Sequence, residues 1–172
     1  MIETMHNNQY TTQFASLNTA KIAGKNAPHK AVLLLAIMDL VEAGIINSPR
    51  IELTERLESS FCRVWKRYIG TSLIFTPKVA TPFWHMQTEP FYRLYMNNGQ
   101  LINGGTGRYS IKWLRENTYA LIDDPLLHLM QDENARAELR VVLISKYLND
   151  LTSKQEIILS ISAVLCLLLS AA

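Results

Sequence analysis

The most regular run of apolar positions in the chain lies at residues 31–44, AVLLLAIMDLVEAG. Its side chains are apolar on nearly every side, which is typical of a helix at the centre of a core. Pro28 suits the first turn of such a helix, Asn26 is a candidate N-cap, and Gly44 can end it in a left-handed conformation. We therefore predict a buried helix from about Pro28 to Ala43.

The residues that follow this helix predict a short strand and a second helix. The strand covers Arg50 to Leu53, and Thr54 is the candidate cap of the helix. Glu55 lies in its first turn, where a negative charge complements the helix dipole. The second helix is expected to end near Gly70.

From Ser72 the pattern of apolar positions changes to one that is typical of strands. The predicted strands cover residues 83–86 and 91–96. The sequence of residues 97–99, Asn-Asn-Gly, is a tight-turn signal, so residues 100–102 are expected to pair back as a hairpin.

Three further helices are predicted toward the C-terminus. Ser110 caps a short helix. Asp123 or Asp124 caps the next helix, whose first turn contains Pro125. A longer helix covers about residues 133–148.

Together these elements predict a single, mostly helical α+β domain with a small antiparallel β-sheet or hairpin. Residues 1–20 are polar and are expected to form a short helix or an arm. Residues 21–150 form the domain itself. Residues 151–172 are expected to form an apolar helix that packs against the domain or mediates oligomerisation.

The apolar run from Ile157 to Ala172 is also a candidate membrane segment. It is uncharged, but it contains only 16 residues. A helix that spans a bilayer needs about 20 apolar residues. We therefore expect this run to be buried or to face a partner, without membrane attachment.

Composition agrees with a globular domain. The chain has 172 residues, of which 48% are hydrophobic and 19% charged. Its cysteines, Cys62 and Cys166, form no CxxC motif, so neither a zinc site nor a disulfide framework is expected. Buried free thiols in a reducing, cytoplasmic compartment are the simplest interpretation.

The charge distribution is more informative than the net charge of +2. Between Ser60 and Arg115 there are eight basic residues and one acidic residue, Glu89. The basic residues are Arg63, Lys66, Arg67, Lys78, Arg93, Arg108, Lys112 and Arg115. They could form one face that binds a polyanion, or they could scatter over the folded surface, and sequence clustering favours neither.

Few residues suggest catalysis. The histidines, His6, His29, His85 and His128, are widely spaced and form no HxxxH or HExxH motif. Glu89 is the single carboxylate of the basic segment, whereas metal-dependent hydrolysis usually needs two or three clustered carboxylates. We expect neither a catalytic site nor a bound metal or cofactor.

Residues 103–109, NGGTGRY, predict a glycine-rich loop. It lacks the GxxxxGK[ST] pattern that cradles nucleotide phosphates. A loop of this kind could carry Arg108 toward a phosphate backbone or a base edge, and a plain surface loop fits the spacing equally well.

The segment Thr81 to Met86 combines a proline, two aromatic side chains and an imidazole. Core packing of Phe83 and a hydrogen-bonded core position for His85 would explain it without any ligand. A resemblance to a known family suggests a second explanation. Residues 27–35, APHKAVLLL, and residues 82–87, PFWHMQ, followed by FYRL, are similar to the sulfur-binding domain.

The sulfur-binding domain lies on the N-terminal side of many HNH-type, modification-dependent (type IV) restriction endonucleases. The likeness covers about residues 20–120. It implies recognition of phosphorothioate DNA, in which sulfur replaces a non-bridging phosphate oxygen. Residues that would line the sulfur pocket or read the DNA are His29, Lys30, Thr81, Pro82, Phe83, Trp84, His85 and Arg108. Backbone phosphates would be held by Lys66, Arg67, Lys78, Ser110 and Lys112.

The function predicted from this resemblance is a reader of phosphorothioate-modified double-stranded DNA in a bacterial type IV restriction system, without a nuclease of its own. Double-stranded DNA is the expected partner, and a nuclease domain or subunit and a second copy of the chain are further candidates. Two alternatives stay open. One is a protein-interaction or oligomerisation domain with an incidental basic surface, and the other is a small enzyme with an unrecognised site.

Overall fold

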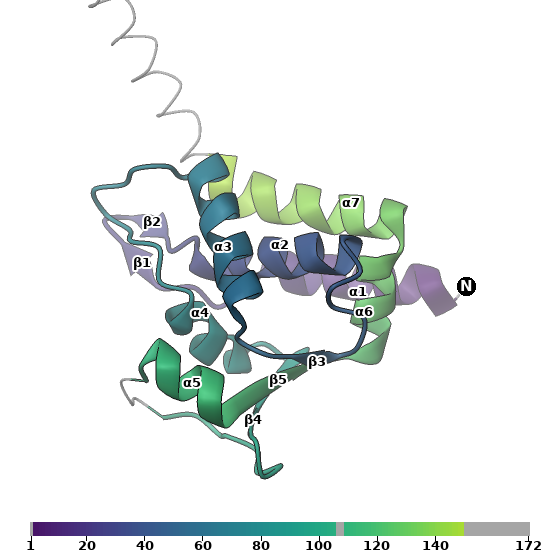
Figure 1. The fold of residues 1–172 in the computed structure, drawn as a ribbon. Coiled ribbons are helices and arrows are strands. Elements are labelled where there is room, and N and C mark those ends of the chain that lie inside the picture. Colours follow the sequence, from purple (N-terminus) through teal and green to yellow (C-terminus); the bar gives the residue numbers. More distant parts are fainter. Residues whose placement is uncertain (1, 106–108, 150–172) are drawn as a thin grey trace, which may run out of the picture.

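The computed structural model describes residues 2–105 and 109–149. Helix α2 (His29–Glu42) runs through the middle of the fold (Figure 1). Every residue from Lys30 to Met38 is buried in it, together with Leu40 and Val41. The predicted central helix is confirmed, and its apolar composition follows from the helices that pack against it from several sides.

The helices around α2 complete one core. Those in contact with it are α3 (Glu55–Tyr68), α4 (Ala80–His85), α6 (Asp124–Gln131) and α7 (Glu133–Leu143). Helix α1 (Ile2–Ala15) packs against α6 and α7, where Tyr10 and Phe14 are buried. Helix α7 continues as the π-helical segment η2 (Ile144–Leu148), so the long helix predicted for residues 133–148 is confirmed.

A three-stranded antiparallel sheet lies below α2 and α3 in Figure 1. Its order is β3 (Arg50–Ile51), β5 (Thr118–Ile122) and β4 (Tyr92–Met96). A short hairpin of β1 (Lys21–Ile22) and β2 (Lys25–Asn26) stands apart from it. The prediction of a mostly helical α+β domain with a small antiparallel sheet is confirmed.

Two predicted helix caps are confirmed by their hydrogen bonds. The Thr54 hydroxyl accepts from the Leu57 N–H at 3.2 Å, and the Ser110 hydroxyl accepts from the Trp113 N–H at 3.1 Å, at the start of α5 (Ile111–Asn117). The prediction for Asn26 is wrong, because this residue lies in β2 and α2 begins after Pro28 without a side-chain cap.

The strand predicted for residues 83–86 is wrong. These residues belong to α4 and to the 3₁₀ turn η1 (Met86–Thr88). Aromatic residues favour strands by propensity, but the buried positions here are Val79, Pro82, Phe83, Trp84 and Met86, and all of them except Trp84 are three or four residues apart. That spacing of three and four residues is helical, and Pro82 sits early enough that its missing N–H breaks no helical hydrogen bond.

The predicted hairpin after β4 is confirmed, but its returning segment makes only one bridge to β4. Gly99 has a φ of 86° in the turn, and Tyr95 pairs with Leu101 through a single bridge. The main partner of β4 is instead β5, which follows it in the chain by more than twenty residues.

Cys62 corrects the expectation of buried thiols, because it is exposed on the outer face of α3. Cys166 and the apolar segment 151–172 lie outside the described residues. Within the described part, no helix is both long enough and apolar enough to cross a membrane.

Candidate functional site

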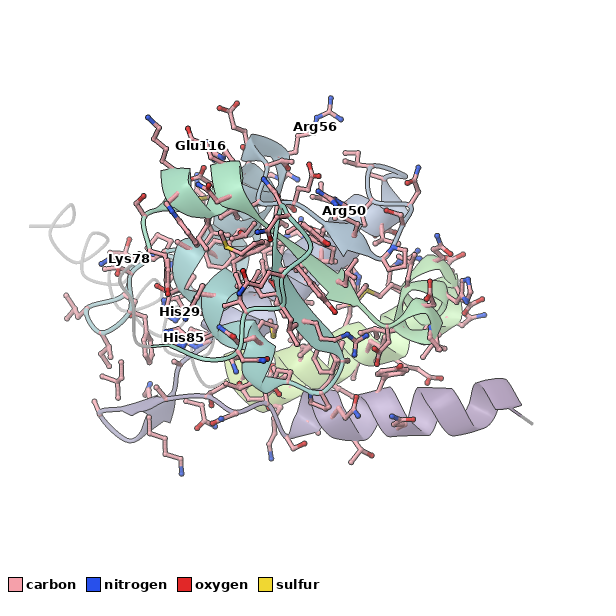
Figure 2. All side chains as sticks on the ribbon, turned by 90° about the horizontal axis from the view of Figure 1, so that it is seen from below. His29, Arg50, Arg56, Lys78, His85 and Glu116 are labelled. Carbon is pink, nitrogen blue, oxygen red and sulfur yellow. The ribbon has the colours of Figure 1, made fainter. Side chains whose placement is uncertain are left out.

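A surface pocket of about 390 Å³ opens beside the N-terminal end of α2 and the exposed side of α4. We call it the α2–α4 pocket. It is lined by Asn18, Thr19, Ala20 and Ala27 around the β1–β2 hairpin, by His29 and Lys30 of α2, and by Thr81, Pro82, His85 and Thr88. Figure 2 shows His29 and His85 close together at this site, with Lys78 near them.

Helical spacing explains how α4 supplies one wall. Thr81 and His85 lie one turn apart and are both exposed, while Pro82 is buried between them and the core. Ala20, Ala27 and Pro82 provide apolar surface. The wall is therefore apolar with hydroxyl and imidazole groups at its edge.

Lys30 is almost fully buried, with 6% of its surface exposed. Its ammonium forms an ion pair with the buried Glu89 carboxylate and donates to the Thr88 hydroxyl at 2.7 Å. The same carboxylate accepts from the backbone N–H of Asn18 at 3.1 Å. The positive charge of Lys30 is thus balanced inside the protein.

The imidazole ring of His29 is fixed on one side of the pocket by a hydrogen bond and an aromatic contact. Its Nε2 donates to the Thr76 carbonyl at 2.8 Å, and the ring packs against Trp65 with centroids 4.9 Å apart. Burial lowers the pKa of His29 against the opposing effect of the Thr76 hydrogen bond, and the charge of Lys78 lowers it a little further. The ring is therefore neutral at pH 7, and the Nε2 bond leaves its lone pair on Nδ1.

The pKa of the partly covered His85 is also lowered, mainly by desolvation and to a smaller extent by the nearby charge of Lys30, so its ring is mostly neutral at pH 7. The histidines of the pocket consequently add no positive charge under ordinary conditions. What the pocket offers is apolar surface, hydroxyl groups and one ammonium whose charge is already compensated.

The comparison with solved structures identifies a similar fold. It is the "Sulfur binding domain of ScoMcrA complexed with phosphorothioated DNA", with a TM-score of 0.60. The sequence identity is 18%, over 80% of this chain and 86% of that chain. No family model matches the chain, and no curated protein matches it. At this identity the likeness shows a shared fold.

Among the residues that the sequence suggested, the fold brings His29, Lys30, Thr81, Pro82 and His85 together in one pocket. Phe83 and Trp84 do not line it. Phe83 is fully buried, and its carbonyl accepts from the Tyr92 hydroxyl at 2.9 Å. The core packing considered for Phe83 is the arrangement observed.

Trp84 holds the ends of the glycine-rich loop. Its ring stacks on Tyr109 with centroids 3.6 Å apart, and its Nε1 donates to the Gly105 carbonyl at 3.3 Å. The Gln87 side chain accepts from the Gly104 N–H at 3.0 Å. Arg108 lies outside the described residues, but the residues on both sides of its segment are attached to α4 and η1.

The basic segment divides into paired and unpaired residues. Arg93 pairs with Asp123 at 2.6 Å, and Arg115 pairs with Glu58 at 2.8 Å. Lys112 is 3.9 Å from Glu116, one turn along α5. For Arg63, Lys66, Arg67 and Lys78, which are all exposed, no ion pair occurs within the described part of the chain. In the described part of the basic segment, these four residues are available to an anionic partner.

Sequence reasoning missed the roles of three charged residues near the pocket, as well as the lining residues Asn18, Thr19, Ala20, Ala27 and Thr88. Lys21 and Lys25 lie on the β1–β2 hairpin, where Lys21 follows the pocket residue Ala20 and Lys25 lies two residues before the pocket residue Ala27. The turn between them, Ala23-Gly24, has positive φ at both residues and is a weaker hairpin signal than Asn-Gly. Glu89 was noticed for its charge, but its pairing with Lys30 requires contact across 59 residues of sequence.

The lining of the α2–α4 pocket contains apolar, hydroxyl, amide and imidazole groups and one ammonium. No carboxylate lines the α2–α4 pocket. In residues 2–105 and 109–149, no group of three or more His, Cys, Asp or Glu side chains is placed to hold a metal ion. The pocket can therefore receive a weakly hydrated group that has a negatively charged atom near the pocket edge.

Proposed function

We propose that this chain binds double-stranded DNA that carries a phosphorothioate linkage, with the sulfur atom in the α2–α4 pocket. The observation that carries this proposal is the convergence of His29, Lys30, Thr81, Pro82 and His85 in one pocket. The structural neighbour was solved with phosphorothioated DNA, which supports the same partner.

The chemistry of the pocket suits sulfur better than oxygen. Sulfur is larger, softer and less strongly hydrated than a phosphate oxygen. Beside Pro82 and Ala27 an oxygen would lose hydrogen bonds to water, at a cost of about 1–3 kcal/mol. Sulfur loses less, so the expected preference for the modified duplex is about 10- to 100-fold.

Affinity would come mainly from cations around the pocket. Lys78 lies next to His29, and Lys21 and Lys25 extend the basic rim on the hairpin side. Lys66 and Arg67 follow Trp65, against which the His29 ring packs. Contacts between such residues and backbone phosphates weaken steeply as salt is added, because binding releases condensed counterions.

We also propose that the chain reads DNA without cutting it, as the recognition part of a type IV restriction system. An HNH nuclease on another domain or subunit would then supply cleavage. The absence of carboxylates from the pocket lining supports this division of labour, because nucleases that use metals hold them with clustered carboxylates.

A gel-shift series tests the proposal. Duplexes of one sequence, with a single phosphorothioate of either configuration or with none, are compared at two salt concentrations and in several sequence contexts. Binding of one modified duplex about tenfold more tightly than the plain duplex is expected. Equal affinity in every context would refute the sulfur site, and absence of any retardation would favour the protein-interaction alternative. Cleavage by the chain alone with Mg²⁺ or Mn²⁺ would refute the assignment as a reader without nuclease activity.

A further inference from the structure

Glu89 is the single acidic residue between Ser60 and Arg115, and it is buried, with 5% of its surface exposed. Burying a charge is costly unless a partner of opposite charge compensates it. Here the partner is the pocket residue Lys30. The protein therefore maintains a buried counter-charge directly behind the site where we place the phosphorothioate.

The geometry limits what Lys30 can offer to a ligand. An ammonium has three N–H donors. One donates to Glu89 and one to the Thr88 hydroxyl, which leaves a single donor. Because Glu89 also balances the charge, the pocket presents one N–H and no net positive charge from this pair.

We propose that Glu89 is a specificity-determining residue, which by neutralising Lys30 prevents the pocket from accepting an ordinary phosphate oxygen. This inference rests on the function proposed above. An oxygen that leaves water needs strong hydrogen bonds in return, and a bond from an uncompensated ammonium is about twice as strong as a neutral one. Sulfur loses less hydration and needs less compensation, so a neutralised pocket favours it.

The simpler alternative makes Lys30 a direct phosphate ligand and Glu89 only a support for the fold. Glu89 does support the fold, since it accepts from the Asn18 N–H and so fixes the segment that forms one pocket wall. The two explanations differ in what they predict for combined substitutions. If Glu89 acts by its charge, removing it should compensate for the loss of Lys30.

The test uses Glu89→Gln, Lys30→Met and the double variant, each measured with the modified and the plain duplex. Glutamine keeps a side-chain oxygen for the Asn18 N–H and removes the charge. Glu89→Gln should bind the plain duplex about tenfold more tightly and so lose most of the preference for sulfur. Lys30→Met should bind both duplexes poorly, because it leaves the carboxylate of Glu89 unpaired beside them. The double variant should recover binding of the modified duplex and keep its preference.

An unchanged ratio of affinities in folded Glu89→Gln would overturn this inference, as would a double variant that binds as poorly as Lys30→Met. Circular dichroism and thermal melting establish that each variant is folded. If Glu89→Gln does not fold, the double variant still distinguishes the two explanations, because it removes both buried charges together. A wild-type chain without any preference for sulfur would refute the proposed function itself, whereas a wild-type preference that Glu89→Gln retains would refute the role of Glu89 alone.

Discussion

Trp84 stacks on Tyr109 at an interplanar angle of 26°, which joins helix α4 to the end of the glycine-rich loop. The preceding and following residues of α4, Phe83 and His85, point into the core and to the pocket edge. One short helix therefore supplies part of the α2–α4 pocket and the attachment for the loop that carries Arg108. A substitution that disturbs the loop attachment is therefore expected to affect the pocket, and a substitution in the pocket wall is expected to affect the loop.

The first prediction concerns this attachment. Tyr109→Ala should lower the free energy of unfolding by about 0.5–1.5 kcal/mol through loss of the aromatic pair, and it should also weaken DNA binding. Urea unfolding and gel shifts measure the two effects. The matched control is Tyr95→Ala, which removes a stacked pair with Tyr119 on the sheet. It should destabilise the fold by a similar amount and leave DNA affinity unchanged, and equal DNA effects of both substitutions would contradict the proposed role.

A second prediction concerns the apolar wall. Pro82→Ala should reduce the preference for the phosphorothioate duplex several-fold, because it removes part of the ring surface that disfavours oxygen. Affinity for the plain duplex should stay the same or rise. The control is Pro90→Ala, since Pro90 is exposed and does not line the pocket. The ratio of dissociation constants for the two duplexes is the relevant measurement, and a uniform loss of affinity would speak against a sulfur contact.

A third prediction concerns the basic rim. Lys78→Glu should weaken binding to modified and plain duplexes alike, and the salt dependence of log K should lose about 0.9 for each phosphate contact removed. Arg56→Glu is the matched control. Arg56 is exposed on α3 and lies away from the Lys78, His29 and His85 group in Figure 2. If both substitutions lower affinity equally, the protein binds DNA through its overall charge rather than through this rim.

The central helix and the caps at Thr54 and Ser110 could be predicted because they depend on local sequence. Local patterns failed at residues 83–86, where aromatic propensity indicated a strand and core packing imposed a helix. They also failed at Asn26, a good cap residue that the chain uses in a hairpin instead.

Some of the residues that line the pocket could be predicted from the sequence. His29, Lys30 and Pro82 were suggested by a resemblance in sequence, and the fold brings them together. The state of Lys30 was not predictable, because its partner Glu89 lies on a distant segment and buried pairing leaves no local signal. The availability of each cation likewise depends on contacts such as that of Arg93 with Asp123, which only the folded chain makes.

The last prediction concerns pH. Burial lowers the pKa values of His29 and His85 below their ordinary value of 6.5. Below about pH 6.5 the unfolded chain therefore binds more protons at these residues than the folded chain does, so the free energy of unfolding should fall as the pH falls from 7 to 5. Chemical unfolding at several pH values measures this slope. His29→Gln should make the slope shallower, whatever it does to stability at pH 7. A slope that His29→Gln does not alter would show that His29 titrates in the folded protein as it does in the unfolded chain.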